Sequence, residues 1–163
     1  LDVSGSMRNP IFNSPITARE GTAAMALVTV RTEPKTHTMA FTREFAEFPI
    51  GQRATLNEVT KAAANQYFGG TDCSLPVLYA LAHKLSVDVF VIYTDNETWV
   101  GHIHPFQALL RYREQMGIPA KLIVVGMTST GFSIADPSDG GMLDVVGFDA
   151  GVPEVMRDFV TRA

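Results

Sequence analysis

Two short, nearly unbroken apolar runs stand out in the pattern of hydrophobic and polar positions. They are VDVFVIYT, which ends at Thr94, and AKLIVVGM, which ends at Met127, and both are rich in Val and Ile. Successive side chains of a strand point to opposite faces, so a strand that is apolar at every position is buried on both sides. We therefore predict two central strands of a parallel sheet at these positions.

Five other segments repeat their apolar residues with the period of an α-helix. These stripes lie within residues 23–28, 56–63, 77–85, 106–110 and 155–160. Ser14 before Pro15 suits an N-cap followed by proline in the first turn, and Thr55 with Glu58 three residues later is a capping box. Two more prolines, Pro105 and Pro153, suit the starts of the last two helices. We predict five helices.

The order of these elements predicts the fold class. Residues 39–41 and 45–48 flank a short polar turn and resemble a hairpin, so we expect one antiparallel edge strand. Residues 128–141 are rich in Gly and Ser and lack periodicity, as a long surface loop does. Alternating strands and helices predict a three-layer, doubly wound, Rossmann-like α/β fold with helices on both faces of a mostly parallel sheet. In such sheets the binding crevice lies at the carboxyl ends of the strands.

Composition narrows the class of protein further. The chain has 163 residues, 46% of them hydrophobic, which suits one domain over residues 1–163. Its net charge is −4 and no Lys/Arg cluster is present, which argues against nucleic-acid binding through this domain's charge alone. The single cysteine, Cys73, suits a reducing compartment, although extracellular domains without disulfides also occur. Of the two locations, we expect the cytoplasm. No apolar run approaches the ~20 residues of a membrane span, and we expect no membrane partner.

The amino end is unusual for this fold. A buried strand normally has ~5 residues, yet only Leu1 precedes the polar segment that starts at Asp2. We therefore expect the chain to be an excerpt of a longer protein.

Hydroxyls and acids gather in three loops at the carboxyl edge of the predicted sheet. Each loop follows a predicted strand or precedes a predicted helix at that edge. The first carries Asp2, Ser4 and Ser6 at alternating positions, so their side chains can face one point. Taken alone, this first segment is better explained as a polar turn, because the D-x-S-x-S pattern arises easily by chance. The second is FGGTDCS, where two glycines precede Thr71, and the third begins with Asp95 directly after the strongest strand.

These oxygen-bearing residues suit a hard divalent ion. Hydroxyls of Ser4, Ser6 and Thr71 would contact the ion, while Asp2 and Asp95 would hold bound waters and orient the hydroxyls. Neutral ligands leave part of the ion's charge uncompensated, so it would accept one more anionic oxygen from a carboxylate or a phosphate. Mg²⁺ is our first choice, and Mn²⁺ and Ca²⁺ fit the same ligands.

This constellation resembles the metal-ion-dependent adhesion site (MIDAS) of von Willebrand factor A domains, which consists of D-x-S-x-S, a later Thr and a later Asp. The resemblance implies a metal site at Asp2, Ser4, Ser6, Thr71 and Asp95. Four longer stretches, GGTDCSLP, FVIYTDNETW, HPFQALLRYREQMGIPAKLIVVGMTSTGFSIADP and GMLDVVGFD, are similar to the A domain of the Ro ribonucleoprotein autoantigen (TROVE) family, which has bacterial members. That family pairs the domain with an N-terminal ring of helical repeats, which binds noncoding Y RNAs and misfolded RNAs in RNA quality control. The resemblance implies that this ring is absent from residues 1–163.

Several other polar residues have a plainer interpretation. Asp72 either supports the metal site or caps a helix that starts near Ser74. His102 and His104 form an H-x-H pair without a third zinc ligand nearby in sequence. Cys73 is a packed thiol or a reactive one with a lowered pKa. Trp99 lines a partner contact or packs on its loop, and Glu97 is a solvated or loop-bonded acid.

Three functions from different classes remain. The leading one is a metal-dependent binding domain of a Ro-type ribonucleoprotein, whose ion accepts an acidic residue of a partner protein or an RNA phosphate. The second is an extracellular adhesion-type A domain that binds a protein ligand through the same ion. The third is a phosphohydrolase with Asp2 as nucleophile, but Ser4 stands where such enzymes place a second carboxylate. We therefore expect a protein that is not an enzyme.

Overall fold

The structure is a computed structural model that describes residues 1–65, 69–95, 100–129 and 134–162. Its strands are β1 (Met39–Phe41), β2 (Phe45–Glu47), β3 (Val89–Thr94), β4 (Lys121–Gly126) and β5 (Met142–Val146). Its helices are the 3₁₀ turn η1 (Gly5–Arg8), α1 (Ala18–Thr32), α2 (Leu56–Ala64), α3 (Leu75–Ala82), α4 (Pro105–Met116) and α5 (Val152–Thr161). No helix in these ranges has the length and apolarity needed to cross a membrane.

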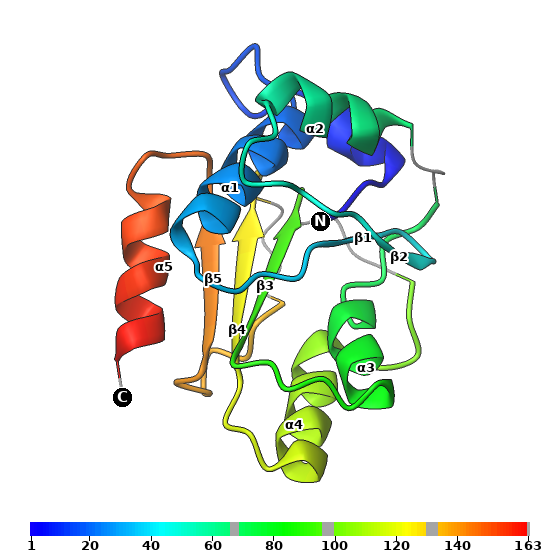
Figure 1. Cartoon of the computed structure of the whole chain (residues 1–163), viewed down its shortest axis with the longest axis vertical. Coiled ribbons are helices and arrows are strands. Elements are labelled where there is room, and N and C mark those ends of the chain that lie inside the picture. Colours follow the sequence, from blue (N-terminus) through cyan, green and yellow to red (C-terminus); the bar gives the residue numbers. More distant parts are fainter. Residues whose placement is uncertain (66–68, 96–99, 130–133, 163) are drawn as a thin grey trace.

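The strands form one hydrogen-bonded surface through the short segment 1–3. β3, β4 and β5 are parallel neighbours, and β1 pairs antiparallel with β2. Between these two groups, the Asp2 N–H donates to the Tyr93 carbonyl at 2.8 Å, and the Val3 N–H donates to the Phe41 carbonyl at 3.1 Å. The segment 1–3 therefore pairs parallel with β1, is hydrogen-bonded to the end of β3 and joins the two. The N-terminus lies next to the arrowhead of β3 (Figure 1).

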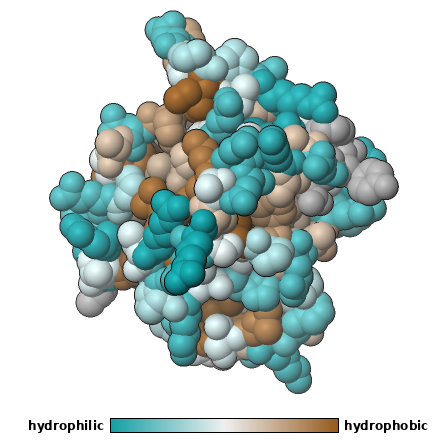
Figure 2. Space-filling view, turned by 45° about the horizontal axis from the view of Figure 1, so that its top comes forward, coloured by the Kyte–Doolittle hydropathy of each residue, from teal (hydrophilic) through white to brown (hydrophobic). Residues whose placement is uncertain are grey.

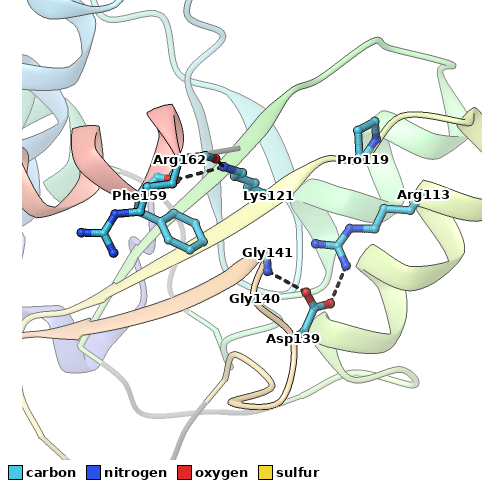
Figure 3. A pocket seen from close by; sticks show the side chains of 8 residues that line it. All are labelled: Arg113, Pro119, Lys121, Asp139, Gly140, Gly141, Phe159 and Arg162. Atoms are coloured by element: carbon cyan, nitrogen blue, oxygen red, sulfur yellow. Dashed lines mark hydrogen bonds and ion pairs between the residues drawn. The ribbon is translucent and has the colours of Figure 1, made fainter.

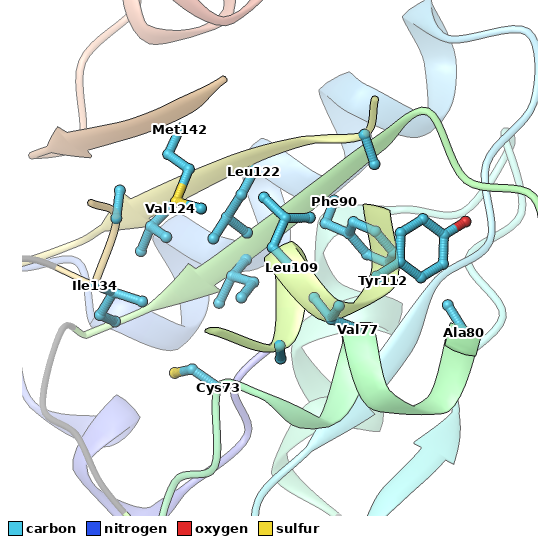
Figure 4. Close-up of a cluster of buried hydrophobic side chains, with 14 of the residues drawn as sticks. Cys73, Val77, Ala80, Phe90, Leu109, Tyr112, Leu122, Val124, Ile134 and Met142 are labelled. Atoms are coloured by element: carbon cyan, nitrogen blue, oxygen red, sulfur yellow. The ribbon is translucent and has the colours of Figure 1, made fainter. Parts of the chain in front are cut away.

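Helices cover both faces of this sheet, as the predicted doubly wound fold requires (Figure 1). α3 and α4 pack on one face against β3 and β4, and their cluster includes Val77, Leu109, Tyr112, Leu122 and Val124 (Figure 4). α1 and α5 pack on the other face around Ile123 and Val125. α2 lies over α1 and completes a smaller cluster there. β3 and β4 are apolar at nearly every position because both of their sides are covered.

A buried hydroxyl ties the first of these clusters to the chain before β3. The Tyr112 side chain is fully buried, and its hydroxyl donates to the Leu85 carbonyl at 2.7 Å and accepts from the Val87 N–H at 2.8 Å. The ring also meets Phe90 edge to face. The turn that follows α3 is therefore held against α4 and β3.

Most predicted elements are confirmed, including all five helices, both central strands and the hairpin. The capping box of Thr55 and Glu58 is present at the start of α2. The predicted helix start at Ser14 and Pro15 is wrong, because α1 begins at Ala18 behind a capping box of Thr17 and Glu20. The Ser14 hydroxyl instead accepts from the Ile16 N–H within a turn.

One strand was not predicted. β5 contains Asp144 and is only partly buried, so it lacks the unbroken apolar run of β3 and β4. It is the outermost strand paired with β4 in the described part of the chain. The predicted long loop 128–141 leads into it, and residues 130–133 of that loop lie outside the described residues.

Candidate metal centre

The first segment folds so that its polar side chains gather at the carboxyl edge of the sheet. Asp2 is 1% exposed, and its Oδ1 accepts from the Ser4 N–H at 2.8 Å. This bond turns the chain out of the sheet and into η1, where the Ser4 and Ser6 hydroxyl oxygens lie 3.1 Å apart. Three residues from alternating positions thus share one small volume, as the D-x-S-x-S spacing predicts.

The end of β3 brings a second acid to the same place. Asp95 directly follows β3 and is 3% exposed. The hydroxyl of the preceding Thr94 donates to Asp2 Oδ2 at 2.8 Å. The Asp95 carbonyl accepts from the Thr128 hydroxyl, which comes from the end of β4. Both oxygens of Asp2 are therefore hydrogen-bonded, and the carboxylate is held in a fixed orientation.

Backbone contacts bring the loop of Thr71 beside these residues. Thr71 is 5% exposed, and its carbonyl accepts from the Val100 N–H at 2.8 Å, just after the Asp95 loop. The Asp72 N–H donates to the Thr42 carbonyl at the end of β1. A Cβ on Gly70 would lie 2.2 Å from Val100 Cγ2, so only glycine permits this close approach.

The site contains two buried carboxylates, those of Asp2 and Asp95. Burial raises the pKa of Asp2 to about 6, opposed by the hydrogen bonds from Ser4 and Thr94 and assisted by the nearby charge of Asp95. Burial also raises the pKa of the Cys73 thiol, and the charges of Asp2, Asp72 and Asp95 add to this effect. The charge of Asp95 thus affects the pKa of Asp2, and both carboxylates affect the pKa of Cys73, two residues after Thr71. All three predicted segments therefore meet at one edge of the sheet.

These residues fit a divalent cation. Two buried carboxylates and three hydroxyls are oxygen donors of the kind that Mg²⁺ binds, and a cation there would offset the burial of Asp2. The described residues contain no cluster of three or more His, Cys, Asp or Glu side chains able to hold an ion. A metal at this edge would therefore depend on the hydroxyls.

The other candidate residues take structural positions where the structure describes them. Asp72 Oδ1 accepts from both the N–H and the hydroxyl of Ser74, the residue before α3, which fixes the turn into that helix without a side-chain cap on its first turn. The Cys73 thiol is buried, which matches its interpretation as a packed thiol. His104 caps α4, because its Nδ1 accepts from the Phe106 N–H, and burial lowers its pKa. His102 is exposed, and no zinc cluster forms with it in the described ranges.

Two candidates, Glu97 and Trp99, lie outside the described residues. Two residues that support the site, Thr94 and Thr128, were not predicted from the sequence, whereas Gly70 is one of the two glycines noted before Thr71. Thr94 had a usable signal, since it is a hydroxyl residue directly before Asp95 at the end of a strand. Thr128 had none, because its role depends on the backbone carbonyl of Asp95, 33 positions earlier in the sequence.

A large cavity lies at the opposite end of the sheet, and the charged groups that line it have structural roles. Its volume is about 680 Å³, and it is lined near the starts of β4 and β5 (Figure 3). Lys121 Nζ donates there to three carbonyls at the end of α5, and Arg113 pairs with Asp139. Its charged groups thus stabilise the ends of helices and strands, and none belongs to the predicted metal site.

The three-layer α/β fold with its candidate site at the carboxyl edge defines a von Willebrand factor A-type domain. A family model described as the Ro60 vWA domain matches residues 1–160. The chain belongs to this Ro60 vWA domain family.

Individual relatives agree with this assignment. The chain is 46% identical over 162 residues to an RNA-binding protein RO60 of Caenorhabditis elegans, covering 99% of this chain and 25% of that protein. It is 51% identical over 161 residues to an RNA-binding protein RO60 of Deinococcus radiodurans, covering 98% of this chain and 30% of that protein. The crystal structure of the Deinococcus radiodurans RO (RSR) protein matches with a TM-score of 0.89 and 50% identity, over 98% of this chain and 32% of that one. The chain thus spans about a quarter to a third of the length of these relatives.

Proposed function

We propose that this domain is the metal-ion-dependent ligand-binding part of a Ro-type RNA-binding protein. Its function is to present a divalent ion, with Mg²⁺ first and Mn²⁺ or Ca²⁺ as substitutes, to a carboxylate or a phosphate of a partner. The observation that carries the proposal is the gathering of Ser4 and Ser6, with hydroxyls 3.1 Å apart, next to the buried carboxylates of Asp2 and Asp95.

In this proposal each residue has a separate task. The hydroxyls of Ser4, Ser6 and Thr71 bind the ion, and the carboxylates of Asp2 and Asp95 orient them and hold its waters. The hydrogen bonds from Ser4 and Thr94 keep Asp2 in position before the ion arrives. The bound ion supplies a Lewis-acidic position that an anionic oxygen completes.

The RNA part of the proposal comes from the family. The relatives are named RNA-binding proteins, and the net charge of −4 supports an RNA site elsewhere than on this domain. We propose that Y RNA and misfolded RNA are bound by a helical-repeat part of such proteins, in RNA quality control. A cytoplasmic location and the lack of enzymatic activity belong to the same proposal. Family membership favours it over the adhesion-type alternative.

Thermal unfolding with and without Mg²⁺ tests the metal site. A ligand at 100 times its Kd stabilises a folded protein by about 2.7 kcal/mol, so 10 mM Mg²⁺ should raise Tm by several degrees. The Ser4→Ala and Ser6→Ala variants should lose this rise. Ser86→Ala is the matched control, because Ser86 is an exposed serine before β3, at the opposite end of that strand.

The outcome separates the alternatives. A rise in Tm that persists in Ser4→Ala would place the ion elsewhere. An unchanged Tm in the original protein at 10 mM Mg²⁺, Mn²⁺ and Ca²⁺ alike would refute the proposal.

A further inference from the structure

An arginine of the β1–β2 hairpin lies against the loop that carries Thr71. A Cβ on Gly70 would lie 3.3 Å from Arg43 Nε, and a Cβ on Gly69 would lie 3.6 Å from Arg43 Cγ. The side chain of Arg43 therefore extends across the two glycines that precede Thr71. Consecutive Cα atoms are about 3.8 Å apart, so Arg43 Nε lies at most about 9 Å from the Thr71 Cα.

Backbone hydrogen bonds hold Arg43 in this place. It is the middle residue of the turn between β1 and β2, in which the Thr42 N–H donates to the Glu44 carbonyl at 2.9 Å. The Thr42 carbonyl accepts from the Asp72 N–H at 3.0 Å, so the hairpin turn and the Thr71 loop are bonded to each other directly. The guanidinium group of Arg43 is thus brought to the metal edge by the fold itself.

The positive charge of Arg43 is not used by the ion pairs in the part of the chain that the structure describes. None of those pairs includes Arg43, although Glu44 follows it in sequence. Asp72, the acid of the loop that Arg43 covers, has its Oδ1 bonded to Ser74. Arg43 is also exposed, so its guanidinium group is accessible to a ligand.

The surface at this end of the molecule favours recognition by charge. Figure 2 turns the end toward which β3, β4 and β5 point in Figure 1 to the viewer, and shows a mainly hydrophilic surface with small, separate hydrophobic patches. A ligand would therefore bind here through polar contacts. A divalent ion and a nearby guanidinium group repel each other, and an anion that contacts both removes this repulsion.

A phosphate monoester suits these two cations better than a carboxylate does. It carries a charge of about −1.5 to −2 at pH 7 and has three terminal oxygens. One oxygen can bind the ion while the other two accept from the planar fork of a guanidinium group. A carboxylate carries a single charge and has one oxygen left once the other binds the ion, so it cannot make the paired contact.

We propose that Arg43 is a specificity-determining residue of the metal centre, which binds two oxygens of a phosphate monoester whose third oxygen binds the ion. This inference rests on the proposed metal-dependent function and names the ligand class of that site. The charge of Arg43 then has opposite effects on the two binding steps. It weakens the binding of Mg²⁺ alone and strengthens the binding of the phosphate that follows.

Calorimetric titration of the purified protein at pH 7.5, first with Mg²⁺ and then with methyl phosphate in 5 mM Mg²⁺, tests this inference. Arg43→Gln should bind Mg²⁺ about two- to fivefold more tightly, because charges of +1 and +2 about 9 Å apart repel each other across a hydrated surface. The same variant should bind methyl phosphate at least about tenfold more weakly, because it loses a paired, charge-assisted contact.

Two further variants separate charge from shape and position. Arg43→Lys should keep the Mg²⁺ affinity of the original protein but lose most of the affinity for methyl phosphate, because an ammonium group lacks the guanidinium fork. Arg53→Gln is the matched control and should change neither affinity. Arg53 is exposed between Gln52 and Ala54, whose carbonyls accept from Arg31 in the last turn of α1, whereas the first turn of α1 adjoins η1.

The results distinguish this inference from the proposed function. No binding of Mg²⁺ to the original protein would overturn the proposed function. Binding of Mg²⁺ without methyl phosphate, or equal affinity of Arg43→Gln and the original protein for methyl phosphate, would overturn the role of Arg43 and leave the metal site intact. Loss of both affinities in Arg43→Gln would show a structural role and overturn it as well. Acetate that binds as tightly as methyl phosphate would overturn the ligand class.

Discussion

Replacing Asp2 by Asn should stabilise the metal-free protein and abolish its response to Mg²⁺. The pKa of Asp2 rises from 3.8 to about 6, a change of about 2 units, because the carboxylate is buried. At 1.36 kcal/mol per unit, the ionised form destabilises the fold by about 3 kcal/mol at pH 7.5. Asn is nearly the same size and carries no charge, so this penalty disappears.

The hydrogen bonds of Asp2 reduce the expected gain. The Asn carbonyl oxygen still accepts from the Ser4 N–H, but its NH₂ group faces the Thr94 hydroxyl, which has to turn and accept. Such a change costs about 1 kcal/mol. The net gain is about 2 kcal/mol in EDTA at pH 7.5, which is roughly 4–8 °C in Tm for a protein of this size.

The pH dependence has a definite sign. An acid whose pKa is higher in the folded state makes the fold less stable as pH rises from the unfolded value of 3.8 to the folded value of about 6. Metal-free protein should therefore lose about 1–2 kcal/mol between pH 5 and 7.5 relative to Asp2→Asn. Asp88→Asn, at an exposed acid just before β3, is the control and should show neither effect.

Urea unfolding in EDTA at pH 5 and 7.5 measures the gain in stability of Asp2→Asn and its pH dependence. Repeating the measurement in 10 mM Mg²⁺ gives the response to the ion. A variant that is destabilised by more than about 1 kcal/mol at both pH values would refute the reasoning about burial. A variant that is still stabilised by Mg²⁺ would refute the role of Asp2 at the ion.

Three further predictions concern the supports of the site and of the fold. Gly70→Val should lower the stabilisation by Mg²⁺ in thermal unfolding, because its side chain would displace Val100 and the Thr71 loop, whereas Gly140→Ala, with nothing within 4 Å, should leave the response unchanged. Tyr112→Phe should lower the free energy of unfolding in urea by about 1–3 kcal/mol, because the buried Val87 N–H loses its acceptor; an effect under 0.5 kcal/mol would contradict this account. Cys73 should react with a thiol reagent at pH 8 only as fast as the protein opens, because burial raises the pKa of the thiol, and rapid labelling of the folded protein would show that it is accessible.

Much of the fold could be predicted because the strongest patterns come from full burial. β3 and β4 are covered on both sides and therefore read as unbroken apolar runs, whereas β5 is half-exposed, contains Asp144 and was missed. The start of α1 was misplaced because Ser14 and Pro15 form a turn whose signals resemble those of a helix start.

The candidate site was predictable in its residues but not in its supports. Asp2, Ser4 and Ser6 are adjacent in sequence, and their spacing alone brings them together. The hydrogen bond of Thr128 depends on how distant loops pack and left no signal in the sequence. The glycine pair before Thr71 did indicate an unusual backbone path, but the close approach of Val100 to Gly70 is visible only in the structure. The metal roles of all five residues stay predictions: Asp2, Ser4, Ser6, Thr71 and Asp95.

The placement of segment 1–3 between β1 and β3 has a mechanical consequence. Val3 is bonded to Phe41 on one side and Asp2 to Tyr93 on the other, so the residues that begin the metal motif sit in the middle of the sheet. A pull applied through Asp2 would be shared as shear by hydrogen bonds on both sides, whereas an edge strand would peel away one bond at a time. Hydrogen bonds on both sides of segment 1–3 would therefore resist a pull at the edge where we propose that a partner attaches.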